Sequence, residues 1–342
     1  MPDKANLLDY DPSTLGSMMT GLGQPAWRAR QLTGWLFQKG AASFAEMTDL
    51  PAPLRSMLEE HFTCGRPELV TKRESRDGTV KYLLGLADGQ RIEAVWLAYR
   101  YGGTACVSTQ AGCRMGCRIC ASGLVGWHRN LTSGEMYGQV LAMEKDHGEP
   151  VTHVVLMGMG EPLDNFEAVR QFIVTLSAPY GHGLSLRRIT ISTCGLVPGI
   201  SRLHKLKWPV NLAVSLHAPT DHLRDRLVPV NRKYPLAELM TACRAYAVET
   251  SRRITFEYAL LGGVNDAPEQ AQELAKLVGG MLCHVNLIPW NAVADLDLVP
   301  SAPSAVRRFQ EILRQKGIAV TVRRKLGTDI EGACGQLRLR DG

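Results

Sequence analysis

The sequence lacks long hydrophobic runs. No stretch of about 18 uncharged apolar residues, the length of a membrane-spanning helix, occurs among its 342 residues. The first residues, Met1 to Asn6, contain neither an apolar signal core nor an arginine-rich presequence. Internal repeats, low-complexity tracts and heptad runs are also absent, which excludes solenoids, disordered polymers and coiled coils. These absences predict a globular, cytoplasmic protein with no membrane partner.

Hydrophobic residues make up 45% of the chain, enough for one large core or for a barrel with a small extra domain. The chain has nine cysteines. Because the cytoplasm keeps thiols reduced, these cysteines indicate metal or thiol chemistry rather than a disulfide scaffold. Four lie in apolar or strand-like stretches and are expected to be small buried hydrophobes: Cys64, Cys194, Cys243 and Cys283. Cys106 and Cys334 do not fit that pattern.

Positive charge is concentrated in the second half of the chain. Residues 180–342 contain 22 Lys and Arg against 14 Asp and Glu, whereas residues 1–179 contain 17 against 19. Basic clusters such as Arg187-Arg188 and Arg323-Arg324-Lys325 are also compatible with ordinary solvated faces. Together they favour a polyanionic partner, with RNA or DNA as the first candidate.

Three cysteines stand in one short loop. Cys113, Cys117 and Cys120 have the spacing C-x3-C-x2-C. Thiolates are the usual ligands of iron–sulfur clusters, and a four-iron cluster held by three of them keeps one iron open to a non-protein ligand. The alternative is a structural zinc site closed by His128 or by a distant cysteine, because structural zinc is four-coordinate. No second C-x2-C pair and no H-x3-H pair is present, so we interpret the triad as catalytic.

The chain divides into four segments. Residues 1–65 predict a helical domain, with helices capped by Ser13, covering Ala26–Gln38, starting at Ser43 and covering Pro53–His61. Residues 66–108 predict a β-rich linker or extension with strands at Tyr82–Leu84, Ile92–Leu97 and Ala105–Ser108, separated by hairpin signals. Residues 109–322 form the main unit, and residues 323–342 form a C-terminal loop.

Six apolar, β-rich runs alternate with helical patterns after the cysteine loop. The predicted strands are Val151–Met157, Arg188–Thr193, Asn211–Leu216, Arg253–Leu260, His284–Pro289 and Ala319–Val322, and the helices cover 132–147, 165–177, 197–206, 235–250, 267–279 and 303–316. This order predicts an α/β fold: a partial, open six-stranded parallel βα barrel with a small N-terminal helical domain. Ligands bind at the carboxyl ends of such strands, where several of the polar motifs fall.

The chain resembles the radical SAM superfamily through the cysteine triad and Gly158-Met-Gly-Glu-Pro162. More closely, it is similar to the RlmN group of rRNA and tRNA adenine methyltransferases. The similarity extends over nearly the whole chain, through Trp27-Arg-Ala-Arg-Gln31, Phe44-Ala-Glu-Met-Thr48, Cys106-Val-Ser-Thr-Gln-Ala-Gly-Cys113, Arg129-Asn-Leu131, Gly158-Met-Gly-Glu-Pro-Leu-Asp-Asn165, Ser215-Leu-His-Ala-Pro219, Leu227-Val-Pro-Val-Asn231, Gly263-Val-Asn-Asp266, Asn286-Leu-Ile-Pro-Trp-Asn291 and Ala333-Cys-Gly-Gln-Leu337.

Two positions depart from that group. Ile119 stands before the third cluster cysteine, where the group usually has an aromatic residue that packs near the adenine of SAM. Gly126-Trp-His128 stands where a phenylalanine commonly precedes the Arg-Asn-Leu motif. We expect the first change to loosen the contact with adenine and the second to affect packing, with cluster ligation untouched by either.

The resemblance implies a [4Fe-4S] cluster on Cys113, Cys117 and Cys120, and two SAM molecules per turnover. It implies SAM contacts from Gly160, Glu161, Ser192, Ser215, Leu216, His217 and Asn291. A side chain at position 160 would obstruct the approach of backbone to the methionine part of SAM, and Glu161 offers an acceptor for the ammonium group. His217 is equally compatible with a hydrogen-bonded histidine at a strand end.

Carbon 2 of adenine has no usable lone pair to attack the methyl group of SAM, so its methylation needs a radical route. The resemblance implies that Cys334 is methylated by one SAM, loses a methyl hydrogen to a radical made from a second SAM, and adds to carbon 2. It also implies that Cys106 releases the RNA by forming a disulfide with Cys334. Glu93 matches the candidate base for the carbon 2 proton; the sequence does not decide between Glu93 and Cys106.

The resemblance also implies the partners: 23S rRNA, tRNA and an electron donor such as flavodoxin. We expect a monomer. Two other functions stay open. A Cfr-type adenine carbon 8 methyltransferase shares the cysteines and the mechanism, although Trp290-Asn291 and the longer N-terminal domain favour the RlmN side. An RNA-binding protein with a structural metal site would explain the basic charge and the cysteine triad, but not Cys334 or Gly160-Glu161.

Overall fold

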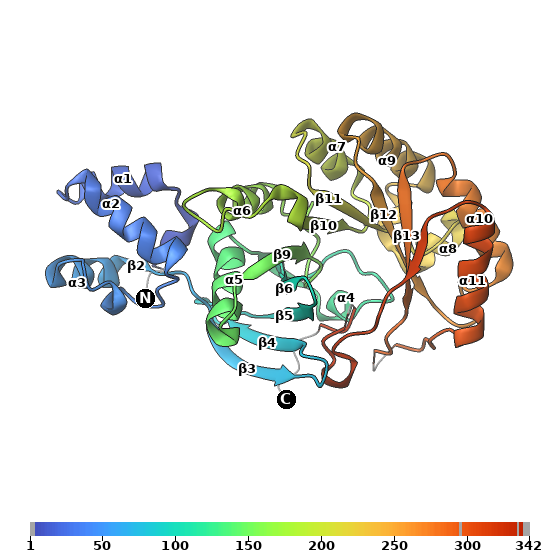
Figure 1. Cartoon of the computed structure of the whole chain (residues 1–342), viewed down its shortest axis with the longest axis horizontal. Helices are drawn as coiled ribbons and strands as arrows, with labels where there is room; N and C mark the ends of the chain where they lie inside the picture. The colour runs from blue at the N-terminus through green and yellow to red at the C-terminus, as the bar shows by residue number, and fades with distance from the viewer. Residues whose placement is uncertain (1–3, 294–295, 334, 338–342) are drawn as a thin grey trace.

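The computed structural model describes residues 4–293, 296–333 and 335–337. Its centre is one ten-stranded sheet with the strand order β14-β13-β12-β11-β10-β9-β6-β5-β4-β3. The sheet curves strongly, helices cover the outer side of its second half, and the N-terminal helices lie apart at one end (Figure 1). Among the described residues, no helix is long and apolar enough to cross a membrane.

One continuous run of neighbouring strands in the sheet is parallel. The run consists of β6 (Gly102–Cys106), β9 (Val151–Leu156), β10 (Ile189–Thr193), β11 (Asn211–Ser215), β12 (Ile254–Leu260), β13 (Cys283–Pro289) and β14 (Val320–Val322). The last six are the strands expected from the sequence, each within one residue of its predicted bounds. The described strands β14 and β3 form the two edges and do not pair with each other, so the sheet is open. The predicted α/β fold is confirmed.

Three further strands continue the same sheet in antiparallel order. They are β5 (Arg91–Tyr99), β4 (Val80–Gly85) and β3 (Glu68–Glu74). The sequence did not predict β3, because every residue of this edge strand is exposed and the strand has no apolar face to reveal it. β6 therefore separates the parallel half of the sheet from the antiparallel half.

The helices of the parallel half connect successive strands. They are α5 (Ser133–His147), α6 (Phe166–Ser177), α7 (Val197–Lys205), α8 (Asp221–Leu227), α9 (Leu236–Thr250), α10 (Pro268–Val278) and α11 (Pro303–Gln315). The six expected helices are present within one residue of their predicted bounds. The additional helix, α8, is short and mostly polar, and its two apolar residues, Leu223 and Leu227, are too few to indicate a helix from the sequence.

The N-terminal helices are α1 (Pro12–Gly21), α2 (Ala26–Thr33) and α3 (Ala52–His61), with a short parallel bridge between β1 (Ala5–Asn6) and β2 (Phe62–Thr63). The expectation that Ser13 caps the first helix is wrong. Asp11 is the cap, because its carboxylate accepts the Thr14 N–H at 2.7 Å and Pro12 occupies the first helical position. The second predicted helix ends at Thr33 and continues as a π-helical turn, Gly34–Gln38.

The N-terminus of α5 contains a capping box that lies close to the cysteine loop. Thr132 Oγ1 accepts the Glu135 N–H at 3.1 Å, and a Glu135 carboxylate oxygen accepts the Thr132 N–H at 2.9 Å. The same carboxylate accepts two hydrogen bonds from the Arg129 guanidinium, at 2.8 and 2.7 Å. The cap therefore fixes the start of α5 and the segment that precedes it.

We expect Thr132→Ala to lower the free energy of unfolding by about 1 kcal/mol, because the Glu135 N–H loses its acceptor. Urea denaturation followed by circular dichroism measures the change. Thr220→Ala is the matched control, since Thr220 is the N-cap residue of α8 but its side chain makes no capping hydrogen bond. If the two variants lost equal free energy of unfolding, the capping hydrogen bond of Thr132 would not stabilise the protein.

Candidate functional site

A pocket at the carboxyl ends of the parallel strands contains about 980 Å³ of empty space, including its mouth. We call it the cofactor pocket. Its walls include Cys113, Cys117, Cys120, Gly160, Glu161, Ser192, Cys194, Ser215, His217, Glu257, Trp290, Arg323 and Gly335. Residues from six parallel strands, or from the segments directly after them, thus meet residues of the cysteine loop in one space.

The cysteine loop is held at its base by a two-stranded ribbon. β7 (Gln110–Gly112) pairs with β8 (Trp127–Asn130), and the Cys113 N–H donates to the Gly126 carbonyl at 2.8 Å. Gly112 has a φ of 77°, and a Cβ there would lie 1.8 Å from the Gly126 oxygen. Glycine is required at this position because the two backbones approach so closely.

Cys113, Cys117 and Cys120 all line the pocket. Burial raises the pKa of the Cys113 thiol to about 12, and burial also raises the pKa of Cys120. Within the described residues, no three His, Cys, Asp or Glu side chains form a group that could hold a metal ion on the geometry of the protein alone. His128, the zinc ligand of the alternative interpretation, is exposed on β8 and does not line the cofactor pocket.

Cys194 is also part of the cofactor pocket, although the sequence suggested only a small buried hydrophobe. The neighbouring Cys194 thiol is the main reason that the pKa of Cys117 is lowered. The Cys194 backbone N–H donates to Glu161 Oε2 at 2.7 Å. Cys194 directly follows Ser192-Thr193 at the end of a parallel strand, and this position in the sequence could have predicted that Cys194 lines the pocket.

Glu161 is buried in the pocket wall, with 3% of its surface exposed. Its carboxylate accepts the N–H groups of Cys194 and Leu163, and burial raises its pKa. Gly160 precedes it with a φ of 101°, and a Cβ there would lie 2.6 Å from the Gln110 Cβ. The fold itself therefore requires glycine at position 160, a reason that the sequence did not show.

The structure brings most of the other expected SAM contacts to the same pocket. Ser192, Ser215 and His217 line it, whereas Leu216 is fully buried behind the strand end and Asn291 lines a neighbouring pocket. His217 Nδ1 accepts the Ala259 N–H at 3.0 Å. Burial lowers the pKa of His217 to about 3, so the ring is neutral and helps to hold two strand ends together.

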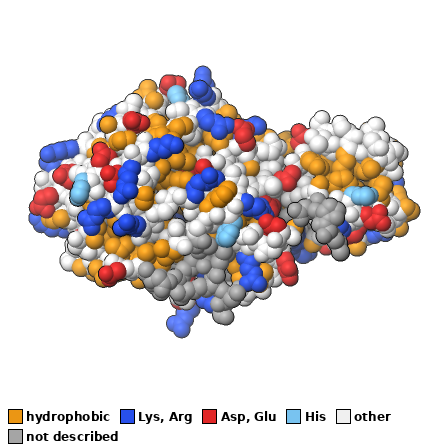
Figure 2. All heavy atoms as spheres, turned by 180° about the vertical axis from the view of Figure 1, so that it is seen from behind, with side chains coloured by type: hydrophobic (Ala, Val, Ile, Leu, Met, Phe, Trp, Pro, Cys, Tyr) orange, Lys and Arg blue, Asp and Glu red, His pale blue; other side chains and the backbone are white. Residues whose placement is uncertain are grey.

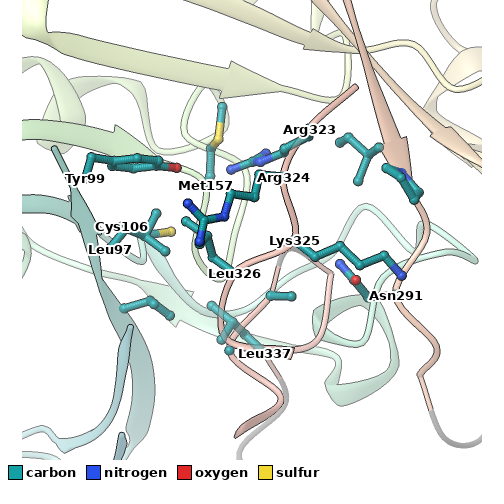
Figure 3. A pocket seen from close by; sticks show the side chains of 15 residues that line it. Leu97, Tyr99, Cys106, Met157, Asn291, Arg323, Arg324, Lys325, Leu326 and Leu337 are labelled. Atoms are coloured by element: carbon teal, nitrogen blue, oxygen red, sulfur yellow. The ribbon is translucent and has the colours of Figure 1, made fainter. Parts of the chain in front are cut away.

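A second pocket adjoins the cofactor pocket and contains about 580 Å³ of empty space, including its mouth. The two pockets share Met157, Ile288 and Arg323 in their walls. In the second pocket the Cys106 sulfur points toward Arg324, and Asn291 lies on the opposite side beside Lys325 (Figure 3). Arg323, Arg324 and Lys325 give this pocket a basic wall.

The structure places Glu93 away from both pockets. It lies on β5 with 1% of its surface exposed, and its Oε1 is 2.6 Å from Lys81 Nζ. The Lys81 ammonium also donates to the Glu331 carbonyl at 3.3 Å. Among the described residues Glu93 Oε2 has no hydrogen-bond partner. The predicted base is therefore covered by a lysine and by the C-terminal tail.

Glu257 is a buried carboxylate that the sequence analysis did not single out. It lies on β12, lines the cofactor pocket and accepts a hydrogen bond from Asn286 Nδ2 at 2.8 Å through Oε2. Burial raises its pKa, and the positive charge of Arg323 opposes that effect. The available signal was one acidic residue within an otherwise uncharged strand, Ile254–Leu260.

Cys334, the expected methyl carrier, lies outside the described residues. Its neighbours are described: Gly335 lines the cofactor pocket, and Ala333 and Leu337 line the second pocket. The disulfide that the resemblance implies between Cys106 and Cys334 stays a prediction.

Three thiols and a glycine-flanked carboxylate at the carboxyl ends of an open parallel sheet define a radical SAM protein, and the comparisons agree. The radical SAM superfamily model matches residues 107–277. A model for the ribosomal RNA large subunit methyltransferase N-terminal domain matches residues 5–64. A solved radical SAM methyltransferase from Sphaerobacter thermophilus is 45% identical, with a TM-score of 0.95 over 98% of this chain and 99% of that chain.

Curated relatives identify the family. A probable dual-specificity RNA methyltransferase RlmN from Pelotomaculum thermopropionicum is 56% identical over 98% of this chain and 92% of the relative. The protein of the same description from Desulforudis audaxviator is 57% identical over 90% of this chain and 96% of the relative. The chain belongs to the RlmN family of radical SAM RNA methyltransferases.

We expect Glu257→Gln to stabilise the ligand-free chain more at about pH 8 than at about pH 5. Burial raises the pKa of Glu257 above its ordinary value of 4.5. The unfolded chain therefore loses this proton at a lower pH than the folded chain, and the free energy of unfolding falls as the pH rises from about 4.5 to the raised pKa. Glutamine keeps an acceptor for Asn286 without the charge. Urea denaturation at the two pH values measures the difference. Glu311→Gln, a change at an exposed position on α11, is the control. If the free energy of unfolding changed equally with pH in both variants, the raised pKa of Glu257 would be contradicted.

Proposed function

We propose that the protein methylates carbon 2 of an adenosine in the peptidyl-transferase region of 23S rRNA, and of an adenosine next to the tRNA anticodon, through an S-methylcysteine at Cys334. The observation that carries the proposal is the pair of adjoining pockets. The cofactor pocket contains the cysteines and Glu161, the second contains Cys106 and a basic wall, and the residues on either side of position 334 face the two pockets.

The chemistry of the cofactor pocket fits the implied groups. Cys113, Cys117 and Cys120 present three soft sulfur ligands toward one space and would hold the [4Fe-4S] cluster. Glu161 would accept the ammonium group of SAM, and Gly160, Ser192, Ser215, Leu216, His217 and Asn291 would supply further contacts, some through the backbone. When bound there, the cluster would supply the electron that cleaves the sulfonium of one SAM molecule, and the other SAM molecule of each turnover would supply the methyl group.

The thiols of Cys334 and Cys106 would perform the transfer. The Cys334 sulfur would carry the methyl carbon to the adenine. The Cys106 sulfur would then give up its proton and attack the Cys334 sulfur, forming an S–S bond and breaking the bond from the Cys334 sulfur to the transferred carbon. The electron pair of the broken bond would stay with that carbon, which would take a proton and remain on the RNA as a methyl group. A thiol must reduce the disulfide before another cycle.

The placement of the two candidate bases favours Cys106 as acceptor of the adenine proton. Cys106 already faces the second pocket, whereas Glu93 is covered by Lys81 and by the backbone of Glu331. Glu93 is the acceptor only if the tail lifts from this position. Proton acceptance needs hydrogen-bond reach to the reacting group, and the described arrangement gives that reach to Cys106 first.

Charge supports an RNA substrate. The second half of the chain has an excess of Lys and Arg, and Figure 2 shows these side chains spread among apolar ones over the barrel as seen from behind. Arg323, Arg324 and Lys325 at the second pocket can contact phosphates while the target base leaves its stack to enter.

The proposal also includes the domain organisation and the partners. The domains are a helical RNA-binding domain (1–65), a β-rich extension (66–108), the barrel (109–322) and the tail (323–342). The protein acts as a monomer and receives electrons from a donor such as flavodoxin.

The first experiment tests the cluster and the product together. Cys117→Ala should lose most cluster iron and all methyl incorporation into 23S rRNA, whereas Cys243→Ala, which removes a buried thiol of α9 outside the cofactor pocket, should retain both. Iron analysis of anaerobically purified protein and mass spectrometry of the RNA nucleosides measure the two effects. A methyl group on carbon 8 would show a Cfr-type enzyme. Zinc without iron in the parent protein would favour a non-enzymatic RNA-binding function.

The second experiment tests the carrier. The tryptic peptide that contains Cys334 should be heavier by one methyl group in protein purified from SAM-replete cells, and unmodified after SAM depletion. Mass spectrometry of the peptide locates the group on the sulfur. The Cys243 peptide is the internal control and should be unmodified. Protein that methylates RNA while its Cys334 sulfur is always unmodified would refute the proposed intermediate.

A further inference from the structure

The described part of the C-terminal tail after the basic cluster, residues 326–333 and 335–337, is bound first by the hairpin of β3 and β4. The Gly327 N–H donates to Asp77 Oδ2 at 2.9 Å, and Ser75 Oγ donates to Asp329 Oδ1 at 2.6 Å. Lys81 Nζ donates to the Glu331 carbonyl at 3.3 Å. The hairpin therefore holds the start of the tail.

The end of the tail is bound by the cysteine loop. The Ala121 N–H donates to the Gly335 carbonyl at 2.8 Å, and Ser122 Oγ donates to the Leu337 carbonyl at 2.9 Å. Ala121 and Ser122 directly follow Cys120 in the chain. Ser122 is 4% exposed and Leu337 is 5% exposed. Because water has little access to either group, the loss of one partner leaves the other unsatisfied.

A third contact joins the tail to the loop after β13. Gln336 Nε2 donates to the Ala292 carbonyl at 2.9 Å, and Gln336 Oε1 accepts the Ala333 N–H at 3.3 Å. The tail is therefore placed between the two pockets: Gly335 faces the cofactor pocket, and Ala333 and Leu337 face the second. Hydrogen bonds from the cysteine loop and from the Gln336 side chain therefore hold the described residues next to position 334 in place.

We propose that Ser122 is a positioning residue, and that its hydroxyl and the Ala121 N–H tie the C-terminal tail to the cysteine loop so that the two become ordered together. A segment held by few hydrogen bonds opens locally at low cost, and each lost bond raises the open population. The coupling is reciprocal, because loosening of the tail must loosen the loop by the same free energy. Its catalytic meaning, that the tie positions the Cys334 sulfur for methyl transfer, rests on the proposed function.

Hydrogen exchange measured by mass spectrometry on the full ligand-free chain tests the tie. In Ser122→Ala, peptides that cover residues 332–337 should exchange roughly tenfold faster, because the Leu337 carbonyl loses its donor. Ser122→Thr keeps a hydroxyl and should stay within about twofold of the parent. Ser133→Ala is the matched control: Ser133 is a comparably buried serine that donates to Asp9, far from the tail in the chain. Unchanged tail exchange in Ser122→Ala would overturn the proposal.

The reciprocal measurement uses a tail residue that does not touch the cysteine loop through its side chain. Gln336→Ala removes the bonds to Ala292 and Ala333, and it should accelerate exchange in peptides that cover residues 118–124 as well as in the tail. A tail that exchanges faster while the loop is unchanged would show that the two are independent.

Kinetics separate this proposal from the proposed function. Ser122→Ala should lower kcat for methyl transfer and leave KM for SAM unchanged, and Ser122→Thr should restore kcat. If the parent protein transfers no methyl group, the proposed function fails, and the exchange measurements still decide whether the tie exists. If methyl transfer is intact in Ser122→Ala while tail exchange is fast, the tie exists but does not position the reacting sulfur.

Discussion

The hydrogen bonds between the extension of β6 and the loop after β9 determine where the groups of the site lie. The Val107 N–H donates to Val155, the Gly158 N–H donates back to Val107, and the Thr109 N–H donates to Met159. Ser108 Oγ completes the joint by donating to the Glu93 carbonyl at 2.5 Å and accepting the Met159 N–H at 2.8 Å. Because of this joint, the cysteine loop and the segment Gly158–Pro162 leave the sheet side by side, and the thiols meet Glu161.

A buried guanidinium supports the opposite wall. Arg224 is fully buried and donates to the Cys194 carbonyl at 2.6 Å, the Leu216 carbonyl at 3.1 Å and Asn231 Oδ1 at 2.8 Å. A buried cation is tolerated only when its donors are satisfied, so Arg224 holds the ends of β10 and β11 in one arrangement. The walls of the cofactor pocket are thereby held in place by the protein's own hydrogen bonds.

The strands of the barrel could be predicted closely because each is a short run rich in apolar and β-branched residues between helical patterns, and in β10 and β13 the apolar residues alternate with polar ones. The edge strand β3 could not, since its side chains are exposed on both faces and no alternation marks it. At the first helix, Asp11 and Ser13 are both good capping residues, and only the position of Pro12 inside the helix decides for Asp11. Local patterns therefore predict elements well and choose poorly between neighbouring residues of similar chemistry.

The sequence by itself determined the chemistry available to this protein: three thiols lie within one segment of eight residues, and Gly158–Pro162 follows a strand. Only the tertiary structure decided which distant residues join them. Cys194 and Glu257 became pocket walls, and Glu93 was paired with Lys81 away from the pocket. The physical reason is that such contacts depend on strand order and on which face each side chain occupies. Both are set when the sheet assembles, and neither is written in the spacing of residues along the chain.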